Sequence, residues 1–203
     1  MRHRVTSPLT AVACALAAAA SGGKLISSWH DPSAGTLNFQ KVLILVIAPH
    51  ESQRQFGEVE LSRLMKRTTG VPSYTVMTPA DVESKESVIA FMARERFDGA
   101  VVMKFIGAGQ EVTDPGVYIP TYSGFWDYYS TGLSMARDPG YIRMARQLQM
   151  EVQVYAMEAA SMKGEKLVWA GLSQTKNPDN AKELLADVVR VVASDLKKHR
   201  LIN

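Results

Sequence analysis

An unbroken apolar run at residues 41–48, with the sequence KVLILVIA, restricts the fold more than any other feature of the chain. A strand with one face in water alternates apolar and polar residues, so this run predicts a strand that is buried on both faces. Strands of that kind belong to parallel sheets, in which crossover helices join neighbouring strands. We therefore expect helices packed against a central parallel sheet.

The segments that follow this run supply the crossovers. Residues 53–69 carry apolar side chains at helical spacing, and residues 71–77 are predicted as the next strand. Thr78 and Pro79 begin a second helix as its cap and its first helical residue. Residues 100–106 are predicted as a third buried strand. This β-α-β-α-β order predicts three parallel strands with the first of them in the middle.

The C-terminal part has a different pattern. Residues 147–158 alternate strictly between apolar and polar side chains, which is typical of an antiparallel strand with one face in water, and residues 166–175 return as its hairpin partner. A short strand is expected at 24–29, and a final helix begins at Asn177-Pro178. We predict a single α/β sandwich domain of two or three layers, in which the hairpin continues the parallel strands.

The first twenty residues are typical of a bacterial secretory signal. Arg2 and Arg4 form a basic start, residues 9–20 are apolar, and Ala18-Ala19-Ala20 precedes Ser21 as a cleavage site. We predict a signal peptide at residues 1–20, a domain at 21–203 and a periplasmic location. The apolar run is shorter than the roughly 20 residues that span a bilayer, and no later segment reaches that length. No transmembrane span is expected in the mature chain.

Cys14 is the single cysteine and lies within this signal. It could be the lipid-attachment residue of an outer-membrane lipoprotein, which is the alternative location. Ala13 is suitably small, but Ala11 stands where such signals usually carry leucine. The sequence favours export without a lipid and leaves lipidation of Cys14 open.

The charge balance argues against a nucleic-acid partner. The formal net charge is +3, but Arg2 and Arg4 leave with the signal, so 21 Lys and Arg remain against 20 Asp and Glu, a net charge of +1. No metal and no cofactor are expected either. The mature histidines, His30, His50 and His199, show no ligand spacing, and no nucleotide-binding loop is present.

No catalytic residues are predicted. Residues 132–136 (GLSMA) only approximate a nucleophile elbow, and Asp31 would face away from Ser28 and His30 along a strand. Glu58 belongs to a pair of helix carboxylates, with Glu60, that we interpret as solvated helix surface.

An aromatic-rich loop at residues 112–146 is the feature that most suggests function. Seven of the 16 aromatic residues fall within residues 118–141. Such a long connection is uncommon unless it is functional or disordered, and Tyr and Trp are typical of recognition surfaces. The candidate partner-binding residues are Tyr118, Tyr122, Phe125, Trp126, Tyr128 and Tyr129. Alternatively the rings pack on the sheet; we expect Trp126 packed and Tyr128 and Tyr129 exposed.

Several segments together resemble a known family. ISSWHDP at 26–32, KVLILVIA at 41–48, VPSY at 71–74, and the closing HRLI at 199–202 resemble uncharacterised bacterial secreted lipoproteins close to domain of unknown function 4136. The resemblance covers roughly residues 24–202. It implies an exported, envelope-associated domain without an assigned activity. The chain lacks the cysteine that those proteins carry shortly before the Trp-x-Asp-Pro segment, which bears on lipid anchoring alone.

The function expected from the sequence is that of a non-enzymatic binding or assembly module of the cell envelope. Its partner would be another envelope protein, the cell-wall polymer or a carbohydrate. The alternative is a periplasmic hydrolase whose catalytic residues the sequence does not identify. A cleft formed by His50, Glu51, Gln110 and Glu111, at the ends of two parallel strands, would favour chemistry.

Overall fold

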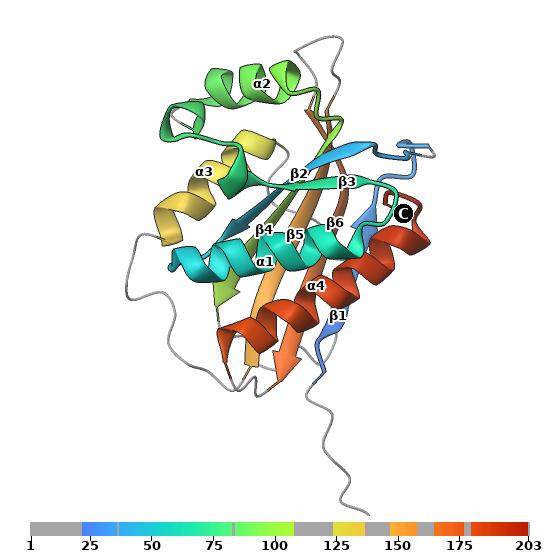
Figure 1. Ribbon diagram of the computed structural model, residues 1–203. Coiled ribbons are helices and arrows are strands. Elements are labelled where there is room, and N and C mark those ends of the chain that lie inside the picture. Colours follow the sequence, from blue (N-terminus) through green and yellow to red (C-terminus); the bar gives the residue numbers. More distant parts are fainter. Residues whose placement is uncertain are drawn as a thin grey trace, which may run out of the picture.

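A mixed sheet with the strand order β1-β6-β5-β4-β2-β3 forms the centre of the molecule (Figure 1). The computed structural model describes residues 22–35, 37–82, 84–107, 124–136, 147–157, 165–176 and 180–202. The strands in this part of the chain are β1 (Lys24–His30), β2 (Lys41–Ile47), β3 (Thr69–Pro72), β4 (Gly99–Gly107), β5 (Gln147–Met157) and β6 (Glu165–Lys176).

The parallel part of the sheet has the predicted order. β2 lies between β3 and β4 and is parallel to both, with Val42 opposite Gly70 on one side and Gly99 on the other. The β5–β6 hairpin continues the sheet antiparallel to β4. β1 adds an antiparallel strand beyond β6, where His30 lies opposite Trp169. The α/β class, the central position of residues 41–48 and the position of the hairpin are confirmed.

Helices cover both faces of the sheet, so the domain has three layers (Figure 1). The helices are α1 (Glu51–Leu64), α2 (Lys85–Arg94), α3 (Phe125–Ala136) and α4 (Ala181–Lys198). α1 and α4 pack side by side on one face, where Ile44, Val46 and Met103 lie in the core. α2 and α3 contribute to the core of the opposite face.

The strand and helix predicted over residues 71–82 are partly wrong. β3 ends at Pro72, which has no N–H to continue a ladder, and short 3₁₀ turns follow at Ser73–Thr75 and Pro79–Val82. The Thr78 hydroxyl donates to Asp81 instead of capping a helix. The cap of α2 is Ser84, whose hydroxyl accepts the N–H of Ser87 at 3.1 Å.

α4 shows how closely the C-terminal helix is tied to the sheet. Its cap is Asn180, which accepts the N–H groups of Lys182 and Glu183, three residues beyond the predicted start. Asp195 near its other end accepts the indole N–H of the buried Trp169 at 2.9 Å. Among the described residues no helix combines the length and the apolar composition needed to cross a bilayer.

Candidate functional site

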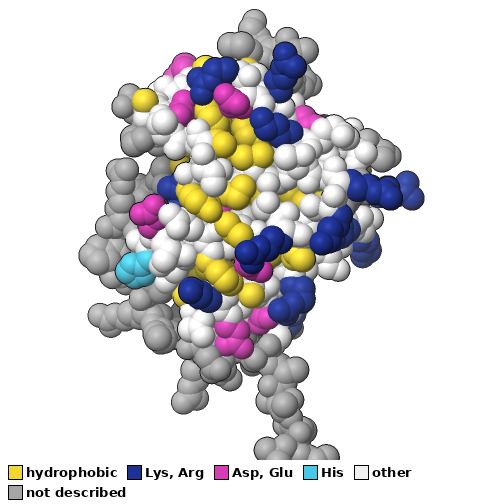
Figure 2. All heavy atoms as spheres, in the orientation of Figure 1, with side chains coloured by type: hydrophobic (Ala, Val, Ile, Leu, Met, Phe, Trp, Pro, Cys, Tyr) yellow, Lys and Arg dark blue, Asp and Glu magenta, His cyan; other side chains and the backbone are white. Residues whose placement is uncertain are grey.

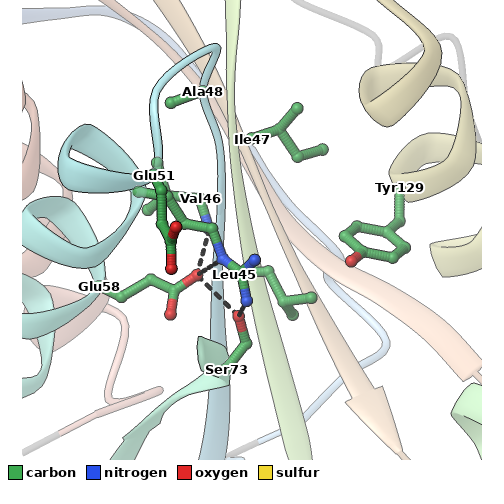
Figure 3. A pocket seen from close by; sticks show the side chains of 9 residues that line it. Leu45, Val46, Ile47, Ala48, Glu51, Glu58, Ser73 and Tyr129 are labelled. Atoms are coloured by element: carbon green, nitrogen blue, oxygen red, sulfur yellow. Dashed lines mark hydrogen bonds and ion pairs between the residues drawn. The ribbon is translucent and has the colours of Figure 1, made fainter. Parts of the chain in front are cut away.

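The candidate site is a pocket at the carboxyl end of β2. β3 pairs with β2 only as far as Ile44, opposite Pro72, whereas β2 continues to Ile47. No described strand therefore lies beside the edge of β2 beyond Ile44, and a cavity of about 240 Å³ lies there (Figure 3). The cavity is lined by Leu45, Val46, Ile47, Ala48, Glu51, Arg54, Glu58, Ser73 and Tyr129.

Glu58 forms the polar wall of this pocket. One carboxylate oxygen accepts the N–H of Val46 at 3.1 Å and the hydroxyl of Ser73 at 2.7 Å, and the other accepts the N–H of Tyr74 at 3.1 Å. The Val46 peptide lies past the last residue paired with β3, so the carboxylate satisfies a donor that a longer β3 would have bonded. Burial raises the pKa of Glu58 above its ordinary value, and the hydrogen bonds from Ser73 and Tyr74 oppose that rise.

The expectation that Glu58 is solvated helix surface is wrong, because the side chain is completely buried. α1 turns Gly57, Glu58 and Leu61 towards the sheet. A Cβ atom on Gly57 would come within 3.1 Å of the Val46 side chain, so glycine allows α1 to lie close to β2. Glu60, its partner in the predicted pair, forms an ion pair with Arg63.

Arg54 is the cation of the pocket. Its Nε atom lies 3.2 Å from Glu58 and its Nη2 atom 3.2 Å from the Ser73 hydroxyl. The side chain is still 37% exposed, so the guanidinium retains N–H groups for water or a ligand. Glu51 adds an exposed carboxylate at the first turn of α1, where it accepts the side-chain amide of Gln55 at 3.0 Å.

Tyr129 of α3 lines the pocket on the other side of β2 from Glu58 (Figure 3). Leu45 and Ile47 complete an apolar lining on that side. The pocket therefore combines hydrogen-bond donors, hydrogen-bond acceptors and one aromatic ring. That arrangement is suited to holding a small ligand in a fixed orientation.

A second polar cluster is buried between the sheet and α3. The prediction that one face of β5 is exposed to solvent is wrong, because Glu151 is 7% exposed and Gln153 is completely buried. Lys104 of the neighbouring β4 is 3% exposed. The Lys104 ammonium lies 3.6 Å from the Glu151 carboxylate. Burial lowers the pKa of Lys104 and raises the pKa of Glu151, and the attraction between the two charges opposes both shifts.

This cluster makes contacts to α3. The Lys104 ammonium lies 4.0 Å from the centre of the Tyr128 ring, and the Tyr128 hydroxyl donates to the backbone carbonyl of Glu151 at 3.2 Å. Gln153 donates to the Glu151 carboxylate, also at 3.2 Å. The Tyr155 hydroxyl contacts the amide oxygen of Gln153 and donates to the carbonyl of Gly124, just before α3, at 3.3 Å.

The structure places four of the predicted partner-binding aromatics on α3, inside the segment expected to be a loop. Phe125, Tyr128 and Tyr129 are buried, so the expectation that the two tyrosines are exposed is wrong. Trp126 is partly buried against the same core. Phe125, Tyr128, Tyr129 and Gly132 follow the i, i+3, i+4, i+7 spacing of a helix face, which is the signal that could have identified α3.

Other predicted residues lie elsewhere or outside the described part. Tyr118, Tyr122 and Cys14 are outside it, as are Gln110 and Glu111, so the expected four-residue cleft is not tested. Of that group, Glu51 lines the pocket and His50 is exposed just before α1.

One pair of histidines lies close together in the structure although its members are far apart in the sequence. The rings of His30 and His199 lie 4.6 Å apart, and His199 is 3.5 Å from Asp195. Among the described residues no group of three or more potential ligands could hold a metal. Asp31 binds Lys166 and Ser33, away from catalytic geometry with Ser28.

Comparisons with known proteins give matches among solved structures. No family model matches the sequence, and no curated protein matches it. Among solved structures, a PelC dodecamer from Paraburkholderia phytofirmans matches with a TM-score of 0.42 at 7% identity, over 89% of this chain and 99% of that chain. Its L103M variant gives 0.40 at 7% identity, over 84% and 96%.

A DUF4136 family protein from Bacteroides thetaiotaomicron matches with a TM-score of 0.37 at 12% identity, over 85% of this chain and 95% of that chain. The chain is similar in fold to this protein and to PelC, at low sequence identity. A protein of the DUF4136 family is thus among the solved structures to which the chain is similar.

Proposed function

We propose that this chain is an exported cell-envelope protein that works as a non-enzymatic binding module. Its ligand is a sugar unit, either free or part of a carbohydrate or of the cell-wall polymer, and it binds in the pocket beside β2. The observation that supports this proposal is the joint presence of Arg54, Glu51 and the Tyr129 ring around one cavity of about 240 Å³.

Sugar recognition requires both kinds of hydrogen-bonding group. Each hydroxyl donates one hydrogen bond and accepts others, and the apolar face of a sugar ring packs against an aromatic side chain. Arg54 supplies donors, Glu51 supplies an acceptor, and Tyr129 supplies the ring. Figure 2 shows apolar patches between scattered charges of both signs on the visible face. Such a mixed surface suits an uncharged ligand better than a polyanion.

A periplasmic hydrolase remains the alternative, and Glu58 is the observation in its favour, because a carboxyl with a raised pKa inside a pocket can act as a general acid. The hydrogen bonds of Glu58 favour binding instead. Both carboxylate oxygens are already engaged by donors from α1, β2 and the turn after β3. Three of these donors bind the same oxygen, which fixes the orientation of the carboxylate and of its neighbours.

The experiment is a titration of the mature chain with neutral and amino-sugar oligosaccharides and with solubilised cell-wall glycan fragments, followed by calorimetry and by amide NMR shifts. We expect saturable binding with shifts around residues 45–54. Arg54→Met should weaken binding at least tenfold. Arg63→Met is the matched control, because Arg63 lies on the same helix, is mostly exposed and does not line the pocket.

Two results would contradict the proposal. One is the absence of saturable binding to any of these glycans, and the other is equal weakening by Arg54→Met and Arg63→Met. Chromatography of the recovered glycan separates the alternatives, since cleaved products that disappear with Glu58→Gln would favour the hydrolase.

Tyr118, Tyr122 and Trp126 are proposed as a further partner surface for an envelope protein or polymer.

A further inference from the structure

We propose that the buried Lys104–Glu151 pair is a positioning device that fixes α3, and through α3 the Tyr129 wall of the pocket. This inference rests on the proposed function for its meaning in ligand binding. Its structural part, the placement of α3, stands on the contacts alone.

The first step is that α3 is held at its start and at its first turn by the polar cluster. The carbonyl of Gly124 accepts the Tyr155 hydroxyl, and Tyr128 reaches the backbone of Glu151 with its own hydroxyl. The Lys104 ammonium lies against the Tyr128 ring. Hydrogen bonds and cation–π contacts depend on direction, unlike apolar packing, so they fix how far α3 is rotated about its axis.

The second step is that the side chains of Ile47 and Lys104 together set the height of α3 above the sheet. A Cβ atom on Gly132 would lie 3.0 Å from the Lys104 side chain and 2.4 Å from that of Ile47. Glycine at this position lets the helix rest directly on the Ile47 side chain and on the aliphatic stem of Lys104. A change in the direction of that stem would therefore shift the helix.

The third step connects this contact to the pocket. Tyr129 follows Tyr128 directly, so its ring points about 100° further around the same helix. A helix turn is stiff, and a rotation of Tyr128 must move Tyr129 with it. The ring that lines the pocket therefore takes its position from the contacts of Tyr128, which are the Lys104 ammonium against its ring and the hydrogen bond of its hydroxyl to Glu151.

Apolar packing alone would give a less specific result. Phe125 and Tyr128 would keep α3 on the sheet by burial, but such contacts tolerate sliding. Replacing a buried ion pair by uncharged residues of similar shape often leaves stability unchanged or higher. We therefore expect the domain to stay folded without the pair, which makes its positioning role testable.

The experiment uses the double variant Lys104→Met with Glu151→Gln, which removes both charges and keeps an acceptor for Gln153. The measurements are amide hydrogen exchange and the ring signal of Tyr129 from carbon-labelled tyrosine, assigned with Tyr129→Phe. We expect an unfolding midpoint close to that of the parent chain. Exchange in residues 125–132 should rise at least tenfold, with β4 and β5 unchanged, and the Tyr129 signal should shift or broaden.

The matched control is Arg63→Met with Glu60→Gln, which removes an exposed ion pair on α1 and should leave α3 exchange unchanged. If the double variant fails to fold, Tyr128→Phe takes its place, because it removes only the hydroxyl contact to Glu151 and should raise α3 exchange at least threefold.

Unchanged α3 exchange with an unchanged Tyr129 signal would overturn the inference, and so would an equal rise in every element. Neither measurement needs a ligand, so failure of the sugar titration leaves this test intact. Where a glycan binds, the double variant should bind it at least fivefold more weakly.

Discussion

Glu58 shows how one side chain can replace part of a strand. Its carboxylate binds the peptide N–H groups of Val46 and Tyr74 and the hydroxyl of Ser73, at the place where β3 has turned away. A buried peptide donor without a partner costs about 1–3 kcal/mol, so this carboxylate stabilises the open edge of β2. Arg54 offsets its charge while keeping part of its own side chain exposed. The pocket therefore exists because Glu58 binds the backbone donor that the short β3 leaves without a strand partner.

The raised pKa of Glu58 predicts the direction of a pH effect. The folded state holds the proton more tightly than the unfolded chain, so this group contributes stability below its ordinary pKa of 4.5, and the contribution is lost as the pH rises through the folded pKa. Urea unfolding of the parent chain and of Glu58→Gln, between pH 4 and pH 7.5, measures this. The stability of the parent relative to the variant should fall as the pH rises. A difference that grows with pH would mean that the hydrogen bonds outweigh burial.

At the scale of elements, α3 packs on the sheet through apolar side chains and also contacts a buried polar cluster. The Phe125 ring stacks on the Tyr129 ring, with 5.8 Å between the ring centres, and meets the Tyr155 ring edge-on, with 5.6 Å between the centres. Tyr128 covers the Lys104–Glu151 pair. Aromatic contacts of this kind contribute beyond the area that they bury. The helix is thus part of the core of the domain, with one of its rings left to line the pocket.

Truncation of two aromatic residues on α3 tests this arrangement. Tyr128→Ala removes a completely buried ring and leaves a cavity, at a cost on the order of 3–5 kcal/mol. Trp126→Ala, on the same helix but only partly buried, should cost less than half as much. The urea unfolding midpoints of the two variants measure these two losses of stability. A larger loss for Trp126 than for Tyr128 would contradict the packing of α3 described above.

The same elements show which parts of the fold sequence patterns can predict. β2 and the β5–β6 hairpin were predictable, because strand burial leaves a local signature of apolar runs or alternation. The burial of Glu151 was not predictable, because alternation on β5 looks the same whether its polar side chains meet water or a covering helix. Glu58 was not predictable either, since its burial depends on the rotation of α1 and on the early end of β3 at Pro72.

At the scale of the whole molecule, the pocket and the start of the described chain lie at opposite edges of the sheet. The pocket lies at β2 and β3, at one edge, and β1 forms the other edge. β1 is fixed at its start by the N–H of Gly23, which donates to the buried carboxylate of Asp187 on α4 at 3.1 Å.

We expect cleavage before Ser21 to leave this anchored start intact. Intact-mass measurement of the protein exported from bacteria should therefore give a chain that begins near Ser21 and carries no acyl group. Cys14→Ser is the informative control, because it should change neither the mass of the mature chain nor its release. A product that begins at an acylated Cys14, and is lost in Cys14→Ser, would establish the lipoprotein alternative instead.

The hydrogen bond between Gly23 and Asp187 also determines how the domain would be presented at a surface. Four strand spacings separate β1 from β2, a distance of roughly 19 Å across the sheet. Any support joined to the chain ahead of Gly23 would therefore hold the domain by the edge farthest from the pocket. Immobilised in that orientation, the domain would keep its pocket accessible to long polymers, which could reach it without passing the point of attachment.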